Sequence, residues 1–476
     1  MVRCAAMRNL KTFSALTTAA LSLTLVASAG AAAPTVVKVG SLPGTPAKYN
    51  KVFITKYGPS SAKKVLLLIP GTNGGAENFA VVGPELAKKV PGLQVWAMDR
   101  REHALEDTTM MRKGLAGSAT PKQVLDYYLG WILNPTQTPK FVPEQAKNFT
   151  FMKDWGMKMQ VEDARAVILQ AKKQGKTVIL GGHSLGGSMA AAYAAWDFNG
   201  KPGYKDIAGV VAIDGGLGGS FGSGDGDSAA NAKANLKTLE VTATNPDGPW
   251  ANLLSIPTLA WASGPFSQIA ALAAMKDPNG PSTLTSFALL PGYLKASYPT
   301  TNEGALGFAF DNDTSPAALS LIQVRAGQMA ASGDPRGWQN GEVTPVQNIA
   351  KGFGGDRYGT NGVDWYYPRR LNIDSGAASS MNPKSPAQKA LGLRVWHLKD
   401  VNVPYYAFQT SLSGSRDGVV NGAKNFAARS KVPKGGLVIV DAKTTTRHLD
   451  PLLAAPATND FLKTVIQFLK SKIKTR

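Results

Sequence analysis

The 476-residue sequence contains a single cysteine, Cys4, close to its N-terminus. The rest of the chain therefore offers no thiolate nucleophile, no internal disulfide and no cysteine ligand for a metal. Stability must come from a packed core, which a chain of this length with 43% apolar residues can supply. The sequence also lacks histidine and carboxylate clusters with metal-site spacing, and it lacks phosphate- or dinucleotide-binding glycine motifs. We expect no metal and no cofactor.

Long apolar runs are scarce, and beyond residue 33 none is long enough to cross a bilayer. Residues 1–33 have the pattern of a secretory signal peptide: a basic start, a short apolar stretch at 13–26 and small-residue cleavage sites within 29–33. The basic residues are Arg3, Arg8 and Lys11. We expect a protein that is secreted, to the periplasm or the medium, after this leader is removed.

Acidic residues are outnumbered, since 32 Asp and Glu face 52 Lys and Arg, for a net charge of +20. The basic residues are spread along the chain, and no zinc-finger, RRM or helix-turn-helix pattern accompanies them. Specific nucleic-acid binding is not indicated, whereas loose electrostatic association with an anionic cell envelope is compatible with this charge. The sequence does not indicate an oligomeric state.

Short apolar runs alternate with helical stretches, as in a largely parallel α/β sheet. The expected strands are Val52–Lys56, Val65–Ile69, Val95–Met98, Thr177–Leu180, Ile207–Ile213, Tyr405–Gln409 and Leu437–Val440. The expected helices are Met159–Lys173, Ser184–Trp196 and Asn459–Lys474.

This alternation stops after residue 214, where residues 215–228 are too rich in glycine and serine for the interior of a helix or strand. We therefore divide the chain after the leader into a first core segment at 34–214, a mainly helical insertion at 215–395 and a second core segment at 396–476. A smaller insertion spans 102–155. The apolar stretch Leu253–Leu294 either lines a substrate groove or forms the insertion's own core.

One motif carries chemistry: Gly182-His183-Ser184-Leu185-Gly186 fits G-x-S-x-G between an expected strand and an expected helix. In this context the pattern predicts a nucleophile elbow, where a serine occupies a strained turn and its neighbours two positions away must lack bulk. The N–H of Leu185 would lie at a helix N-terminus, where developing negative charge is stabilised.

On these residues the chain resembles the α/β-hydrolase-fold serine hydrolases, specifically secreted esterases and lipases with a large inserted cap. The resemblance covers both core segments and implies a mostly parallel sheet flanked by helices, with the elbow after the fifth strand and the cap after the sixth. It also implies a second oxyanion donor after the third strand, where "LLLIPGTNGGAENF" stands. By position this donor is the N–H of Thr72, with Asn73 as the alternative; Pro70-Gly71 departs from the His-Gly that many members have.

A histidine must accept the serine proton, and the sequence has four. The family order Ser…acid…His selects His448, which follows the last expected strand. His183 lies inside the elbow, where we expect its side chain to face away in a packing or supporting role. His103 is a candidate for the pocket rim, and His397 precedes an expected strand.

The triad acid has two candidates. Asp417 follows the strand Tyr405–Gln409, at the usual family position, and is preferred; Asp214 ends the strand before the insertion and is the alternative. The charged run from Asp99 to Glu102 follows another strand, and we expect it to form a structural salt-bridge network.

These residues predict a secreted serine hydrolase that cleaves a small-molecule or lipid-like carboxylic ester through a Ser184–His448–Asp417 triad and an acyl-enzyme intermediate. An exported peptidase or amidase and an acyltransferase are the enzymatic alternatives on the same fold. A cell-surface binding protein without activity is the alternative from another class.

Overall fold

The computed structural model describes residues 33–219, 228–254 and 258–474. The expected signal peptide lies outside the described residues except for Ala33, and so does most of the glycine-rich stretch 215–228. Among the described helices, none combines the length and the apolar character needed to cross a membrane.

An eight-stranded sheet forms the centre of the molecule, with strand order β1-β2-β4-β3-β5-β6-β9-β10. Its strands are β1 (Thr35–Lys38), β2 (Lys51–Tyr57), β3 (Lys64–Ile69), β4 (Leu93–Asp99), β5 (Thr177–His183), β6 (Val210–Ile213), β9 (Tyr405–Gln409) and β10 (Leu437–Asp441). β2 runs antiparallel to β1 and β4, and the remaining pairs are parallel. The expected mostly parallel sheet is confirmed.

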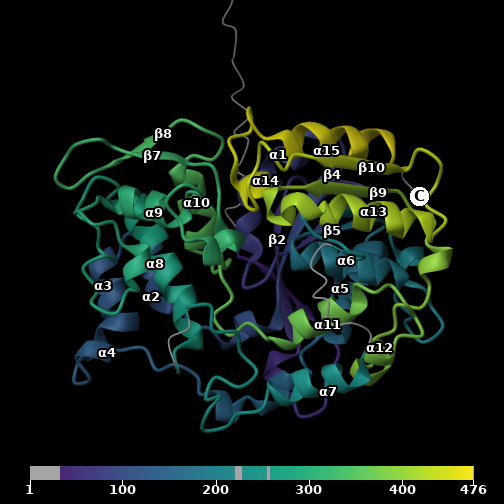
Figure 1. Ribbon diagram of the computed structural model, residues 1–476, viewed down its shortest axis with the longest axis horizontal. Coiled ribbons are helices and arrows are strands. Elements are labelled where there is room, and N and C mark those ends of the chain that lie inside the picture. The colour runs from purple at the N-terminus through teal and green to yellow at the C-terminus, as the bar shows by residue number, and fades with distance from the viewer. Residues whose placement is uncertain (1–32, 220–227, 255–257, 475–476) are drawn as a thin grey trace, which may run out of the picture.

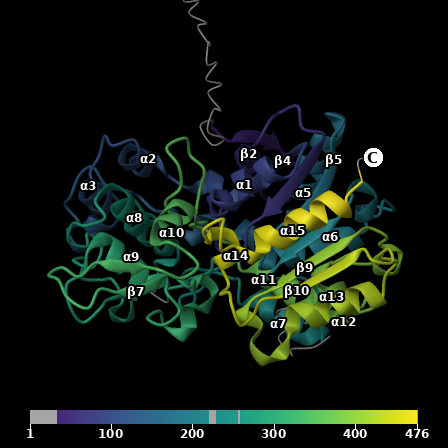
Figure 2. The same cartoon turned by 90° about the horizontal axis from the view of Figure 1, so that it is seen from above.

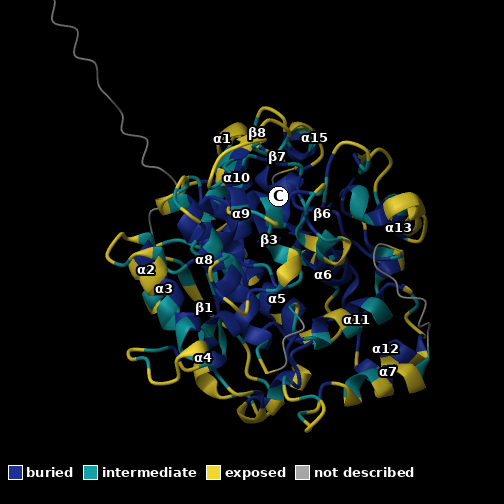
Figure 3. Cartoon of the chain, turned by 60° about the vertical axis from the view of Figure 1, so that its left-hand side comes forward, coloured by how far each residue is buried: buried dark blue, intermediate teal, exposed yellow. Residues whose placement is uncertain are grey.

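Both faces of the sheet are covered, which explains why its strands are continuous apolar runs. Along β3, Val65, Leu67 and Ile69 point to one face, where they pack with α5 (Met157–Lys173), α6 (Leu185–Ala195) and α13 (Gly418–Ala428). Leu66 and Leu68 point to the other face, toward α1 (Val82–Lys89) and α15 (Asp460–Ser471). Figure 2 shows α15 and α6 near the strands of this layered core, and Figure 3 shows that its interior is buried.

A second lobe lies beside the core, on the left in Figure 1. It contains α2 (Thr109–Leu115), α3 (Pro121–Leu125), α4 (Trp131–Leu133), α8 (Ser263–Lys276), α9 (Asn302–Phe310), α10 (Val346–Gly354) and the hairpin of β7 (Gly327–Met329) and β8 (Trp338–Asn340). Aromatic rings from the segment 102–155 pack against rings from the segment 215–395 in this lobe. The ring centroids of Tyr128 and Trp365 are 5.3 Å apart, and those of Phe141 and Trp261 are 5.0 Å apart. The lobe is thus built from both insertions.

The rest of the segment 215–395 packs on the core itself. It comprises α7 (Ala229–Lys237), α11 (Arg370–Ala378) and α12 (Pro386–Leu391). Leu371 of α11 and Leu391 of α12 belong to the same buried cluster as the helices α5 and α6. The insertion therefore contributes to two places, a lobe and one layer of the core.

Candidate active site

Ser184 sits at a sharp turn between β5 and α6, with φ 55° and ψ −122°. This left-handed backbone is costly for a residue with a side chain and must be held by its surroundings. A Cβ on Gly182 would lie 2.3 Å from the carbonyl carbon of Gly186, and one on Gly186 would lie 2.0 Å from the carbonyl oxygen of Ile69. Both positions therefore require glycine, and the motif forms the strained turn that its spacing predicts.

His448 and Asp214 form a buried pair in which His448 Nδ1 lies 2.5 Å from Asp214 Oδ2. His448 lies in the loop between β10 and α14 (Asp450–Leu453), and Asp214 directly follows β6. Thr410 fixes the carboxylate, donating its backbone N–H to Oδ1 at 2.8 Å and its hydroxyl to Oδ2. With Nδ1–H donated to Asp214, neutral His448 carries its lone pair on Nε2, the nitrogen that a general base would use.

The structure differs from the preferred expectation for the acid, because it brings Asp214 to His448 and holds Asp417 elsewhere. Asp417 accepts hydrogen bonds from Lys443 and from Gln409, and its side chain is 38% exposed. The hydrogen bond from Lys443 lowers the pKa of this carboxyl. The sheet order supplies the reason: β6 lies directly beside β5, so the residue after β6 ends close to the elbow, while Asp417 stands beyond a turn that follows β9.

His183 does not face away from the site, in contrast to the expectation from its position in the elbow. Its Nε2 lies 2.8 Å from the backbone oxygen of His448, and the two rings are 4.3 Å apart. Burial, aided by neighbouring His448, places the pKa of His183 well below its usual value. Neutral His183 therefore donates its Nε2–H to the main chain of His448, which is the supporting role expected for it.

The loop after β3 passes against the serine: a Cβ on Gly71 would lie 3.0 Å from Ser184 Cβ. Gly74 N–H donates to Gly71 O at 3.2 Å, and Asn73 has φ 54°, as at the third position of a type II turn. We call residues 71–74 the oxyanion loop. Thr72 of this loop lines the same cavity as Ser184, and Leu185 opens α6, whose first N–H groups have no acceptor within the helix.

A cavity of about 1250 Å³, part of it open to solvent, extends from this point into the lobe. Ser184, His183, His448 and the oxyanion loop line one end. The remaining walls are mostly apolar and include Leu254, Phe266, Leu284, Leu290, Leu306 and Phe310. Trp261, by contrast, packs among the aromatic rings of the lobe. The stretch Leu253–Leu294 therefore contributes both to the walls of the cavity and to the lobe's own apolar core.

The charged run after β4 forms a buried salt-bridge network. Arg100 Nη1 lies 2.7 Å from Asp364 Oδ2, and Arg101 Nη2 lies 2.6 Å from Asp163 Oδ1. His103 bonds to Glu106 and to the carbonyl of Gly359 rather than standing at the pocket rim. Asp364 could not be singled out from the sequence, because this residue lies in the insertion, where no motif marks it.

His397 bonds to Asp197, with 2.9 Å between Nε2 and Oδ1, and is not among the residues that line the cavity. Among the described residues, no group of three or more His, Cys, Asp or Glu is arranged to hold a metal ion. The serine, the histidine pair and Asp214 are thus the groups that the structure gathers at the cavity end.

Comparison with known proteins identifies the fold of the central segment. Residues 64–218 match the family model described as the alpha/beta hydrolase fold. The search of curated protein sequences gave no match.

Similar solved structures include a lipase, an esterase and an epoxide hydrolase. A soluble variant of monoglyceride lipase from Saccharomyces cerevisiae is 13% identical, with TM-score 0.36, over 94% of this chain and 98% of that one. A thermophilic esterase from Thermogutta terrifontis is 11% identical, with TM-score 0.37, over 93% and 100%. An epoxide hydrolase from Vigna radiata is 13% identical, with TM-score 0.41, over 92% and 97%.

The match covers β3 to β6, and so it includes the oxyanion loop, the elbow and Asp214. This protein has the α/β-hydrolase fold.

Proposed function

We propose that this protein is a secreted serine hydrolase that cleaves carboxylic esters with an apolar acyl group. The observation that carries the proposal is the pairing of His448 with Asp214 at the cavity end where Ser184 stands in its strained turn. An α/β-hydrolase fold is compatible with many reactions, so the proposal depends on these side chains.

In the proposed reaction, Ser184 Oγ attacks the ester carbonyl while His448 Nε2 takes the hydroxyl proton. Asp214 stabilises the imidazolium and holds the ring in the required tautomer. The N–H groups of Leu185 and Thr72 stabilise the oxyanion. His448 then protonates the departing alcohol, and water activated by the same ring releases the acid from the acyl-enzyme.

The cavity supports an apolar acyl group, since the walls beyond the reactive end are mostly aliphatic and aromatic. Each methylene buried there should contribute about 0.8 kcal/mol, or roughly fourfold in kcat/KM. A series of nitrophenyl esters from two to twelve carbons should therefore show rising kcat/KM until the cavity is filled. A preference for aminoacyl anilides over these esters would favour the peptidase alternative.

The decisive experiment is labelling with a fluorophosphonate probe, which reacts with activated serines. We expect the wild type to be labelled and Ser184→Ala to remain unlabelled. Ser188→Ala is the matched control, because its hydroxyl lies one turn further along α6 and bonds to Gly216 O at 2.7 Å. An unlabelled wild type would leave a binding protein as the better interpretation.

Secretion is part of the proposal and rests on the pattern of residues 1–33. Expression of the full chain in a bacterial host should deliver to the periplasm or medium a protein whose N-terminus lies between residues 30 and 34. An uncleaved N-terminus on the exported or retained protein would contradict it.

A further inference from the structure

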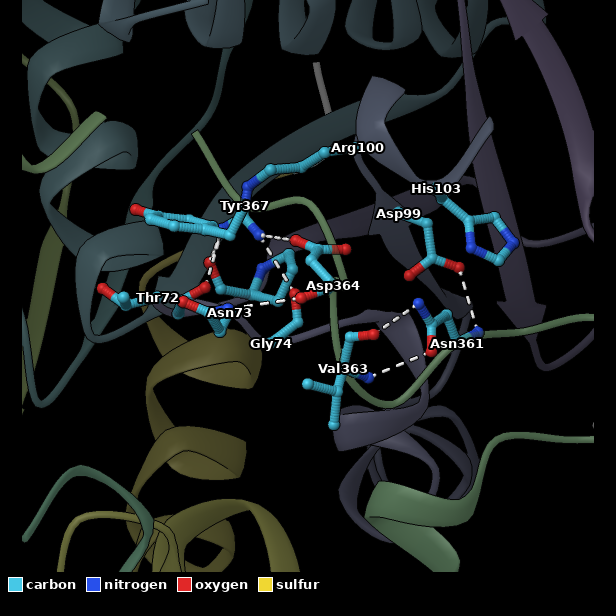
Figure 4. Close-up of polar contacts among 12 residues, drawn as sticks. Thr72, Asn73, Gly74, Asp99, Arg100, His103, Asn361, Val363, Asp364 and Tyr367 are labelled. Carbon is cyan, nitrogen blue, oxygen red and sulfur yellow. Dashed lines mark hydrogen bonds and ion pairs between the residues drawn. The ribbon is translucent and has the colours of Figure 1, made fainter. Parts of the chain in front are cut away.

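Arg100 lies beside the oxyanion loop (Figure 4). It is not among the residues that line the cavity. It is 1% exposed, and all of its donors have acceptors. Nε donates to Gln160 Oε1 at 3.0 Å, Nη1 donates to Asp364 Oδ2 and to Gly74 O, and Nη2 donates to the carbonyls of Pro70 and Gly71. A guanidinium has five N–H groups, so its capacity is fully used.

Three of these bonds fix backbone carbonyls of one short stretch, Pro70, Gly71 and Gly74. The Gly71 carbonyl lies 2.9 Å from Nη2. Because a trans peptide is planar, the N–H of Thr72 must point opposite to this carbonyl, away from the guanidinium. Gly71 itself lies against Ser184, since any Cβ at position 71 would approach Ser184 Cβ to 3.0 Å. The bond to Gly71 therefore sets the direction of one proposed oxyanion donor.

Asp364, from the insertion, holds both the guanidinium and the loop. Its carboxylate lies 2.7 Å from Arg100, its N–H donates to Asn73 O at 2.9 Å, and its carbonyl accepts from Asn73 Nδ2 at 3.2 Å. Burial lowers the pKa of Arg100, but Asp364 and Glu102 outweigh this, and the pKa lies above its usual value. Burial and the charge of Asp364 raise the pKa of Glu102 well above its usual range. Asp364 is the carboxylate in direct contact with the guanidinium, and this contact makes it the counter-ion.

We infer that Arg100, held by Asp364, is a positioning residue that keeps the Gly71–Thr72 peptide turned so that Thr72 N–H meets the oxyanion. The inference rests on the proposed function and deepens it. Lysine cannot replace this residue, because a single ammonium on a flexible stem lacks the planar fork that reaches three carbonyls and a carboxylate at once.

The test compares two neighbouring arginines with the same chemistry. Arg100→Lys removes the fork at the loop. Arg101→Lys is the matched control, since Arg101 bonds to Asp163 on both oxygens and to Asn50 and Gly40 rather than to the loop. For each variant, kcat and KM are measured on a nitrophenyl ester, together with binding of a trifluoromethyl ketone, which forms an oxyanion adduct with the serine, and of the matching unreactive ether.

We expect Arg100→Lys to lower kcat by about 10²- to 10³-fold, the usual effect of losing one oxyanion donor, with KM changed by less than about threefold. Affinity for the trifluoromethyl ketone should fall by a similar factor, and affinity for the ether should hold. Arg101→Lys should retain kcat for each folded molecule. If Arg100→Lys does not fold, Asp364→Asn is the second variant and should show the same pattern with a smaller fall.

Unchanged kcat in Arg100→Lys, or equal losses of ketone and ether binding, would overturn the positioning role while leaving the proposed function intact. Fluorophosphonate labelling of the wild type at Ser184 separates the two claims. A wild type that is not labelled overturns both, because there is then no oxyanion for the loop to meet.

Discussion

Two buried polar clusters flank the oxyanion loop, and they differ in the protonation state of a buried histidine, His183 in one and His103 in the other. The Ser184 cluster (Ser184, His183, His448 and Asp214) opens onto the cavity, and its buried His183 is kept neutral by burial and by the neighbouring imidazole. The side chains of the Arg100 cluster (Arg100, Asp364, Asp99, His103 and Glu106) are buried, the most exposed being His103 at 9%. Its histidine, His103, lies between two acceptors, Glu106 and Gly359 O, at 2.9 Å each.

Histidine therefore has a different protonation state in each cluster: His183 is neutral, whereas His103 is protonated. Burial lowers the pKa of His103, but the charge and hydrogen bond of Glu106 outweigh it and raise the pKa to about 9. Burial favours the neutral form of a histidine in both clusters, and the carboxylate of Glu106 beside the ring reverses this at His103. The lesson is that an adjacent acid, and not the depth of burial, sets the charge of a buried histidine here.

The largest expected effect separates the two candidate acids, Asp417, which the sequence favours, and Asp214, which the structure pairs with His448. Asp214→Asn should lower kcat by about 10⁴-fold, because an amide at this position favours the wrong tautomer of His448. Asp417→Asn should stay within about twofold, since this exposed group bonds to Lys443. Steady-state kinetics of the two variants, with circular dichroism to check folding, measure this difference. Equal losses of kcat in both variants would contradict the assignment of Asp214 as the triad acid.

The next effect concerns stability in the supporting region. Asp163→Asn removes the charge that both oxygens of Asp163 present to Arg101 at 2.6 Å. Leaving a buried guanidinium without its counter-ion should lower the free energy of unfolding by about 3–5 kcal/mol. Urea denaturation measures it, and a change below about 1 kcal/mol would mean that water reaches Arg101.

The smallest effect tests the charged state of His103. Its folded pKa of about 9 exceeds the ordinary value of 6.5, so its contribution to stability is complete below about pH 6.5 and is lost as pH rises toward 9. The stability difference between wild type and His103→Gln should shrink over this range, by at most about 1.4 kcal/mol per pH unit. Urea unfolding at pH 6.0 to 9.5 gives the two profiles, and parallel profiles would mean that His103 is neutral in the folded protein.

Much of the core could be predicted because buried parallel strands are continuous apolar runs. The strand Tyr405–Gln409 has the predicted bounds, and β3 begins one residue before the prediction. The elbow could be predicted because two close backbone approaches demand glycine at 182 and 186. β1 was not predicted, since its four residues lie at the sheet edge and bury one side chain.

The acid was harder, because two strands each end near an aspartate and the sequence does not state which loop reaches the histidine. The answer depends on the sheet order, which puts β6 next to β5. Asp364 was out of reach for a different reason. Its role arises from a contact between residues 264 positions apart, and no local pattern in the insertion marks it.

The pairing between the oxyanion loop and the insertion limits how this chain can be shortened or recombined. Gly74 bridges to Val363, Gly75 N–H donates to Gly362 O, and Glu77 N–H donates to Asn361 O. A variant that lacks the whole insertion, or a chimera that exchanges it as one block, would lose the backbone contacts that hold residues 74–77 in place. Any graft of a foreign lobe has to leave residues 361–364 in place, so the natural unit of exchange is smaller than the inserted segment.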